Sequence, residues 1–188
     1  MKKTTSISLL ILGVIGLSSF IYFEFSSANT EDVKEQNNDI IGEFTLEEFK
    51  ATSHKKWYED RYEAYQLNPD VVEKASSVID DNNFRITVYM GTWCEDSQRE
   101  FPVLIKFLNH IDYEFKNLRL VGVNEDKVVP NLTEEKRKKL NVFNVPTIIV
   151  YNQEGKELNR FVEFPQETLE KDMLKILSGE DYNHVYDF

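Results

Sequence analysis

The chain has 188 residues, which is enough for one domain of ordinary size together with an export segment and a short extension. Its 41% hydrophobic and 13% aromatic content exclude a chain that stays unfolded for lack of apolar side chains to bury. The formal net charge of −11 argues against a nucleic-acid partner, because binding to phosphates requires clustered Lys and Arg without acids that cancel them.

Residues 1–28 have the pattern of a targeting segment. Lys2-Lys3 precedes an apolar run over residues 7–23, and Ser26-Ser27-Ala28 provides small residues for a cleavage site. A run of about 17 residues is also long enough to span a bilayer uncleaved, so a signal peptide and a membrane anchor both fit. Either form sends the rest of the chain to the periplasm or to the outer face of the cytoplasmic membrane.

Two segments connect the targeting segment to the main domain. Residues 29–44 are polar and acidic with little periodicity, which predicts a tether. Thr45 and Glu48 then form a Thr-x-x-Glu capping box, which predicts the start of a short helix. Residues 45–69 are therefore expected to form a helical extension that packs on the domain, although a binding surface is the alternative interpretation. Its aromatic residues at near-helical spacing are Trp57, Tyr58, Tyr62 and Tyr65.

Helices and strands alternate at the start of the remaining region, residues 70–188. Asn68-Pro69-Asp70 provides a cap and a first-turn proline for a helix. The β-branched and aromatic residues of 84–90 predict a strand, which a long helix beginning near Cys94 follows. A second strand is predicted over about residues 117–123. A helix that connects two such strands predicts a right-handed parallel unit.

Three further elements are predicted in the last third of the chain. They are a charged helix capped by Asn131 and running through Lys139, a β-hairpin of residues 147–151 and 157–163, and a final helix opened by Pro165. Together with the earlier elements they predict an α/β fold with a central mixed sheet flanked by helices. The residues after the last helix give no pattern from which a structure can be predicted.

Short motifs stand at three places in this order of elements. Trp93-Cys94-Glu95-Asp96-Ser97 follows the first strand, Pro102 lies within the next helix, and Val145-Pro146-Thr147 opens the hairpin. Over roughly residues 70–178 the chain resembles the thioredoxin superfamily, with Cys-x-x-Ser where a thioredoxin carries Cys-x-x-Cys. The resemblance implies a thioredoxin-like fold, a cis peptide bond before Pro146 and a backbone edge there that pairs with a bound peptide.

The single cysteine, Cys94, cannot form a disulfide within the chain, although exported domains commonly contain paired cysteines. At a helix N-terminus, unpaired backbone N–H groups and the helix dipole favour the thiolate, which is the nucleophile of thiol-disulfide exchange. Glu95 and Asp96 oppose this effect by their negative charge. The same two acids also stabilise the first turn of the helix, which is a sufficient structural explanation for them.

Two departures from the thioredoxin pattern concern one step of its reaction. Ser97 replaces the second cysteine, so the chain cannot resolve a mixed disulfide by itself. Val88 replaces the buried acid of many thioredoxins, which accepts the proton in that step. A hydroxyl at position 97 can still donate a hydrogen bond to the Cys94 thiolate. The resemblance therefore implies a monothiol role, in which another thiol releases Cys94.

Two functions of different classes fit these residues. In the first, the chain is an exported monothiol oxidoreductase or isomerase: Cys94 is the nucleophile, Ser97 its hydrogen-bond partner, and Trp93, Val145 and Pro146 bind the substrate. Its partners would be protein or peptide clients with thiols or disulfides, and an external thiol or redox partner protein. In the second, it is a non-catalytic module that binds a protein or peptide, and the cysteine is incidental. No cofactor is expected, and the three histidines are too far apart in sequence for a metal site.

Overall fold

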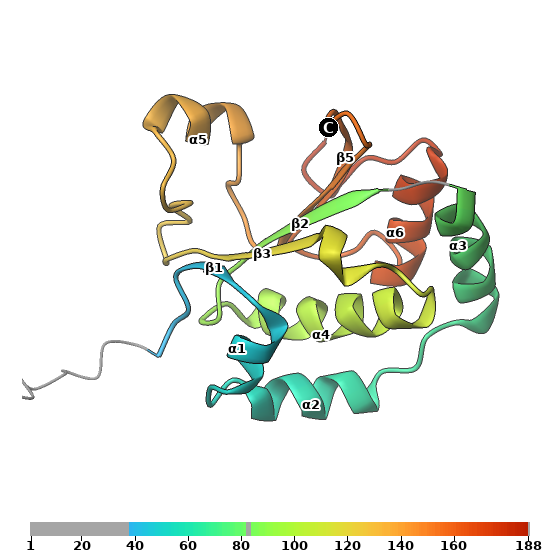
Figure 1. The fold of residues 1–188 in the computed structure, drawn as a ribbon, viewed down its shortest axis with the longest axis horizontal. Coiled ribbons are helices and arrows are strands. Elements are labelled where there is room, and N and C mark those ends of the chain that lie inside the picture. The colour runs from blue at the N-terminus through green and yellow to red at the C-terminus, as the bar shows by residue number, and fades with distance from the viewer. Residues whose placement is uncertain (1–37, 82–83, 188) are drawn as a thin grey trace, which may run out of the picture. The chain divides into compact units, whose positions relative to one another are not determined.

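The computed structural model describes residues 38–81 and 84–187, so the predicted targeting segment 1–28 and the run 7–23 lie outside the described residues. Figure 1 shows the arrangement of its elements. In chain order these are β1 (Gly42–Phe44), α1 (Leu46–Lys50), α2 (Lys55–Ala64), α3 (Pro69–Asp81), β2 (Arg85–Met90), α4 (Glu95–His110), a 3-10 turn (Phe115–Asn117), β3 (Leu118–Gly122), α5 (Glu134–Leu140), β4 (Thr147–Tyr151), β5 (Glu157–Val162) and α6 (Leu169–Ser178).

The strands form one mixed sheet in the order β1-β3-β2-β4-β5. β2 and β3 are parallel, whereas β1 with β3, β2 with β4 and β4 with β5 are antiparallel. The predicted α/β fold with a mixed sheet flanked by helices is thereby confirmed, and so is the parallel unit around α4.

Strand directions determine which loops meet. β2, β3 and β5 all end at one edge of the sheet, because β5 is antiparallel to β4 and β4 is antiparallel to β2. β4 begins at the same edge, and β1 begins there too, since Gly42 pairs with Gly122 at the end of β3. The segments that contain Cys94 and Val145-Pro146 are therefore brought together from positions far apart in the sequence.

The two faces of the sheet are covered unequally, following the alternation of side chains along β2. Ile86, Val88 and Met90 belong to the larger core, which includes apolar residues of α3, α4 and α6. Tyr89 belongs to a smaller cluster with Val121 and others on the opposite face. Figure 1 accordingly shows α2 and α4 on one side of the strands and α5 on the other.

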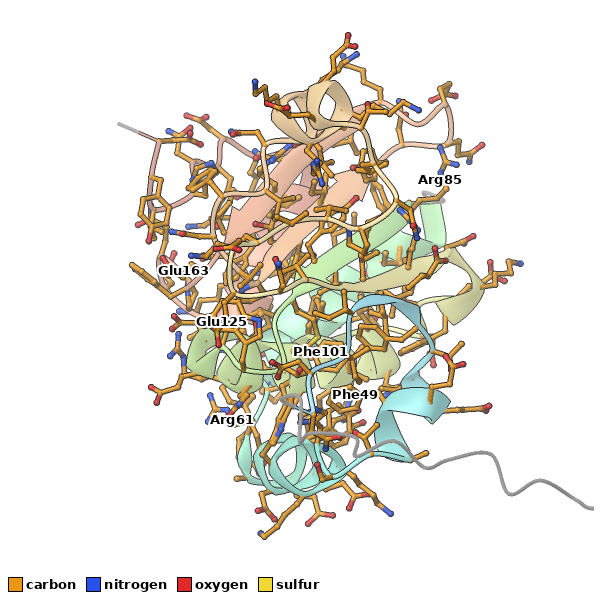
Figure 2. All side chains as sticks on the ribbon, turned by 90° about the vertical axis from the view of Figure 1, so that its left-hand side faces the viewer. Phe49, Arg61, Arg85, Phe101, Glu125 and Glu163 are labelled. Carbon is orange, nitrogen blue, oxygen red and sulfur yellow. The ribbon has the colours of Figure 1, made fainter. Side chains whose placement is uncertain are left out.

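The helical extension packs tightly on the domain through aromatic side chains. Its first helix begins with the predicted capping box: Thr45 Oγ1 accepts the Glu48 N–H at 3.1 Å, and the Thr45 N–H donates to the Glu48 carboxylate at 2.7 Å. Phe49 is fully buried, with its ring centroid 5.3 Å from that of Phe101 in α4. Both residues are labelled in Figure 2. Tyr58 of α2 packs on the same ring at 5.8 Å. These contacts hold α2 outside α4 as a further layer.

Three predicted boundaries need correction. The tether predicted over residues 29–44 ends earlier, because the backbone of Gly42–Phe44 pairs with β3 as an edge strand. Thr133, not Asn131, caps α5, since its side chain accepts the Lys136 N–H at 3.3 Å.

The final helix begins at Leu169 rather than at Pro165. Asp172 explains this later start, because its carboxylate accepts the N–H groups of Gln166 and Glu167 and so fixes the preceding residues in a turn. Gly179 ends the helix in the left-handed conformation at φ +71°. Within the described residues, no helix is both long and apolar enough to cross a membrane.

Candidate functional site

Cys94 occupies the N-cap position of α4, directly after the loop that follows β2. Its backbone is extended, at φ −87° and ψ 123°, and its carbonyl accepts the first helical N–H, that of Gln98, at 2.9 Å. The residue is partly exposed, and Sγ donates a hydrogen bond to the Val145 carbonyl at 3.2 Å. The sulfur thus lies at a helix N-terminus and against the loop before β4.

The loop before β4 is held on both sides of its proline. The Val145–Pro146 peptide bond is cis, as predicted from the sequence. The Thr147 hydroxyl donates to the Asn144 carbonyl at 2.6 Å, and the Pro146 carbonyl accepts the Glu163 N–H at 2.7 Å. These bonds fix the position of the Val145 carbonyl that faces Cys94.

Trp93 forms a wall beside the cysteine. Its indole Nε1 donates to the Val123 carbonyl, just past the end of β3, at 3.0 Å. The ring lies across Gly91, where an added Cβ would stand 2.5 Å from Trp93 Cε2. Gly91 is therefore required for this ring position, because any larger residue would displace the indole.

Ser97 is fully buried one turn into α4. Its Oγ accepts the Gly91 N–H at 3.2 Å, which gives a partner to a backbone donor that burial removes from water. The hydrogen bonds that the structure gives Ser97 and Cys94 both run to backbone groups. By accepting the Gly91 N–H, Ser97 supports the loop that leads to the cysteine, while donation from its hydroxyl to a Cys94 thiolate stays a prediction.

An arginine that the sequence analysis did not single out alters the charge around the cysteine. Arg99 binds Asp96 at 2.5 Å and Glu100 at 2.7 Å, which partly neutralises one of the two acids between Cys94 and Ser97. Glu95 is exposed to solvent, where its charge is screened. Burial raises the pKa of Glu100, and the Arg99 guanidinium opposes that rise.

Glu163 is a second residue near the site that the sequence did not indicate. It follows β5 with a left-handed backbone at φ +66°, and its carboxylate accepts hydrogen bonds from Asn144 Nδ2, at 3.0 Å, and from the Tyr186 hydroxyl. Burial raises the pKa of Glu163, and the negative charge of Asp96 raises it further. Recognising it would have required the position of the C-terminal tail, which no local sequence pattern predicts.

Thr92 connects the site to the residues before β1. Its buried hydroxyl accepts the Ile40 N–H at 3.1 Å and donates to the Asp39 carboxylate at 3.2 Å. The Thr92 carbonyl accepts a hydrogen bond from the side-chain amide of Gln98 at 2.8 Å. No sequence signal marks this residue, because its partners lie far away along the chain.

The structure therefore brings Trp93, Cys94, Val145 and Pro146 together at one edge of the sheet, with Ser97 buried beneath the loop. Among residues 38–81 and 84–187, no group of three or more His, Cys, Asp or Glu side chains is arranged to hold a metal ion.

Comparisons with known proteins agree on the kind of fold. A family model described as thioredoxin matches residues 43–175. The solved structure of a protein of unknown function from Pseudomonas aeruginosa is 21% identical and superposes with a TM-score of 0.51, covering 74% of this chain and 84% of the other. An HIV epitope-scaffold has the same identity and coverage and a TM-score of 0.50. At this identity the two structures show a shared fold. A comparison with curated proteins found no match.

Proposed function

Because this chain belongs to the thioredoxin family, we propose that it is a monothiol exchange protein, in which Cys94 attacks a disulfide of a protein or peptide client. The observation that supports this proposal is the position of the sulfur. Cys94 is a partly exposed residue at the N-terminus of α4, next to Trp93, and its Sγ lies 3.2 Å from the Val145 carbonyl oxygen. The helix N-terminus stabilises the thiolate, and the partial exposure admits a second sulfur.

The exchange proceeds in two steps. The Cys94 thiolate attacks one sulfur of the client disulfide, a Cys94–client disulfide forms, and the other client sulfur leaves as a thiolate. In the second step another thiolate attacks the client sulfur of this mixed disulfide, which restores the Cys94 thiolate. If that thiolate belongs to the client, its disulfides are rearranged; if it belongs to an external thiol, the client becomes disulfide-linked to that thiol.

The second step needs a thiol from outside the chain. Ser97 carries a hydroxyl, which does not attack a disulfide, and Val88 is buried and apolar. In this proposal Ser97 supports the loop, while Trp93 and the Val145–Pro146 backbone bind the client segment next to the sulfur.

We also propose that the domain acts outside the cytoplasm, in the periplasm or at the outer face of the cytoplasmic membrane. The motivation is the order of Lys2-Lys3 and the apolar run 7–23 in the sequence. A C-terminal fusion to a phosphatase that is active only outside the cytoplasm should be active in cells. An inactive fusion that accumulates at a normal level would contradict this localisation.

The second candidate function is a non-catalytic module that binds a protein or peptide. Two observations favour it: the Cys94 side chain packs against the smaller core cluster, and its thiol is engaged by the Val145 carbonyl. The reactivity of the native thiol separates the two functions.

The decisive experiment compares the native chain with Ser97→Cys. Native Cys94 should react with iodoacetamide, faster as the pH rises, and Ser97→Cys should form an internal disulfide, because the positions are one helical turn apart and Cβ atoms must approach to about 3.5–4.5 Å. The variant should then reduce insulin with dithiothreitol as the electron donor, at several times the rate of the native chain.

Ser77→Cys is the matched control, since it adds a thiol at an exposed position of α3 and should leave insulin reduction unchanged. If Cys94 does not react in the native state and Ser97→Cys folds without forming the internal disulfide, the proposed exchange function is refuted. The non-catalytic binding module is then the better interpretation.

A further inference from the structure

Aromatic side chains of the C-terminal tail and of two loops gather on the surface beside the site. Phe143 is 38% exposed and Phe164 is 42% exposed, although large apolar side chains are usually buried. Tyr186 joins them: its ring centroid lies 5.5 Å from that of Phe143 and 6.3 Å from that of Phe164. We call Phe143, Phe164 and Tyr186 the tail patch.

The tail patch is continuous with the proposed client-binding backbone. Phe143 lies in the loop that contains Val145, whose carbonyl accepts the Cys94 thiol. Phe164 directly follows Glu163, and the Glu163 N–H donates to the Pro146 carbonyl at 2.7 Å. A chain segment that lies along Val145 and Pro146 beside the sulfur therefore reaches the tail patch within a few residues, at about 3.3 Å per residue when extended.

A carboxylate lies beside the tail patch. Glu163 accepts hydrogen bonds from Asn144 and Tyr186, and Figure 2 shows it at the same side of the molecule as Glu125 of the loop after β3. The cations that face it are Lys127 and Arg99, and Arg99 is already bound by Asp96 and Glu100. With a net charge of −11 for the whole chain, this surface favours a cationic partner.

We propose that the tail patch and Glu163 select the client: they bind an extended segment that places an aromatic or large aliphatic side chain on Phe143 and Phe164 and a Lys or Arg side chain at Glu163. Aromatic anchors next to a charge that pairs on binding are the usual composition of energetically dominant interface sites. This inference rests on the proposed function for its description of the segment as a client, whereas the binding itself does not require a reactive cysteine.

The test measures binding without thiol chemistry. The full chain in detergent micelles is titrated into fluorescein-labelled, cysteine-free nine-residue peptides, and fluorescence anisotropy gives Kd. The peptides contain Phe with Lys, Phe with Glu, or Gly with Lys at the same two positions. The Phe–Lys peptide should bind about tenfold more tightly than either of the other two, since one good apolar anchor or one charge match is typically a factor of about ten.

Single substitutions identify the residues that cause the preference for the Phe–Lys peptide. Phe143→Ala and Phe164→Ala should each weaken binding of the Phe–Lys peptide by about fivefold to thirtyfold. Glu163→Gln keeps an acceptor for Asn144 and Tyr186 but should abolish the preference for Lys over Glu. Leu158→Ala removes an equally exposed apolar side chain from β5 and should change no Kd. Because all these positions are at least partly exposed, unfolding is not expected, and thermal melts of each variant verify it.

Equal Kd values for the three peptides would overturn the inference, and so would binding that the Phe variants leave unchanged. Self-association of the chain that is lost in Phe143→Ala, together with unselective peptide binding, would instead assign the tail patch to a second copy. A separate reaction with oxidised glutathione, measured as mixed disulfide by mass, tests the proposed exchange. An inert Cys94 with selective peptide binding refutes the exchange alone, and a reactive Cys94 with unselective binding refutes the client selection alone.

Discussion

Arg99 pairs with two acids in the first turns of α4, next to Cys94. From the sequence, Glu95 and Asp96 oppose the helix dipole with two full charges. In the structure, Asp96 and the buried Glu100 share the Arg99 guanidinium, at 2.5 and 2.7 Å, so the negative charge in the first turns of α4 is partly neutralised. The first turns of α4 thus keep an excess of acids, but Asp96 is held in an ion pair beside Cys94.

Glu100→Gln should change how stability depends on pH. Burial raises the pKa of Glu100 above its ordinary value of 4.5, more than Arg99 lowers it. A carboxyl with a raised folded-state pKa binds its proton more tightly in the folded protein, so its contribution to stability is present at acid pH and is lost as the pH rises through that pKa. Gln does not ionise. The free energy of unfolding of Glu100→Gln should therefore rise relative to the native chain from pH 4.5 towards neutral pH.

Urea unfolding at a series of pH values measures this difference. Glu73→Gln, at an exposed position of α3, serves as the control and should give a difference that is independent of pH. A Glu100→Gln difference that stays constant would show that Arg99 balances the burial of this carboxyl, and one that falls as the pH rises would show that Arg99 outweighs it; either result contradicts the prediction.

Among the elements, β1 and the residues before it connect the N-terminal part of the chain to the site. The Asn38 carbonyl contacts His54 Nε2 at 2.6 Å, and Ile40 and Asp39 both bind the Thr92 hydroxyl. The Ile40 backbone lies so close to β3 that a Cβ added to Gly122 would stand 2.0 Å from the Ile40 carbonyl oxygen. The edge strand thus depends on a glycine in β3 and on the loop before Cys94, neither of which local sequence patterns reveal.

Thr92→Val tests this connection. Valine has nearly the shape of threonine but leaves the partly buried Ile40 N–H without its acceptor, and the loss of such a hydrogen bond costs about 0.5–1.5 kcal/mol. The free energy of unfolding in urea should fall by that amount, and amide exchange at Ile40 should become faster. Thr92→Ser keeps the hydroxyl and should cost less than half as much. If the two variants are equally stable, the hydroxyl does not hold the segment.

At the scale of the whole molecule, the sequence predicted the parts of the fold that depend on local pattern. Periodicity and capping residues located α3, α4 and the β4–β5 hairpin, and the Trp93-Cys94 and Val145-Pro146 motifs located the site. The parts that were missed depend on contacts between distant residues. β1 is only three residues long and is defined by pairing with β3, and the tail is held by side chains of α6 and β5.

Tyr182 is the residue that we expect to hold the tail. Its side chain is 6% exposed, its hydroxyl donates to the buried Asp172 carboxylate at 3.1 Å, and its carbonyl accepts from Asn159 Nδ2 at 2.8 Å. Tyr182→Ala should lower the free energy of unfolding by about 3–5 kcal/mol, because it leaves a cavity of aromatic size in the core. Tyr182→Phe keeps the ring and should cost about 1.5–3 kcal/mol for the lost hydrogen bond to a charged group.

Tyr186→Ala provides the comparison, since this ring is only partly buried and its removal should be less costly than Tyr182→Ala. Urea unfolding of the three variants ranks the contributions of the two tyrosines to stability.

The tail patch depends on the same anchoring, because Tyr186 follows Tyr182 by a few residues and can contact Phe143 and Phe164 only while the tail stays in place. Tyr182→Ala should therefore also weaken binding of the Phe–Lys peptide, measured under conditions in which this variant is still folded. An unchanged Kd in that variant would show that the tail is held without Tyr182.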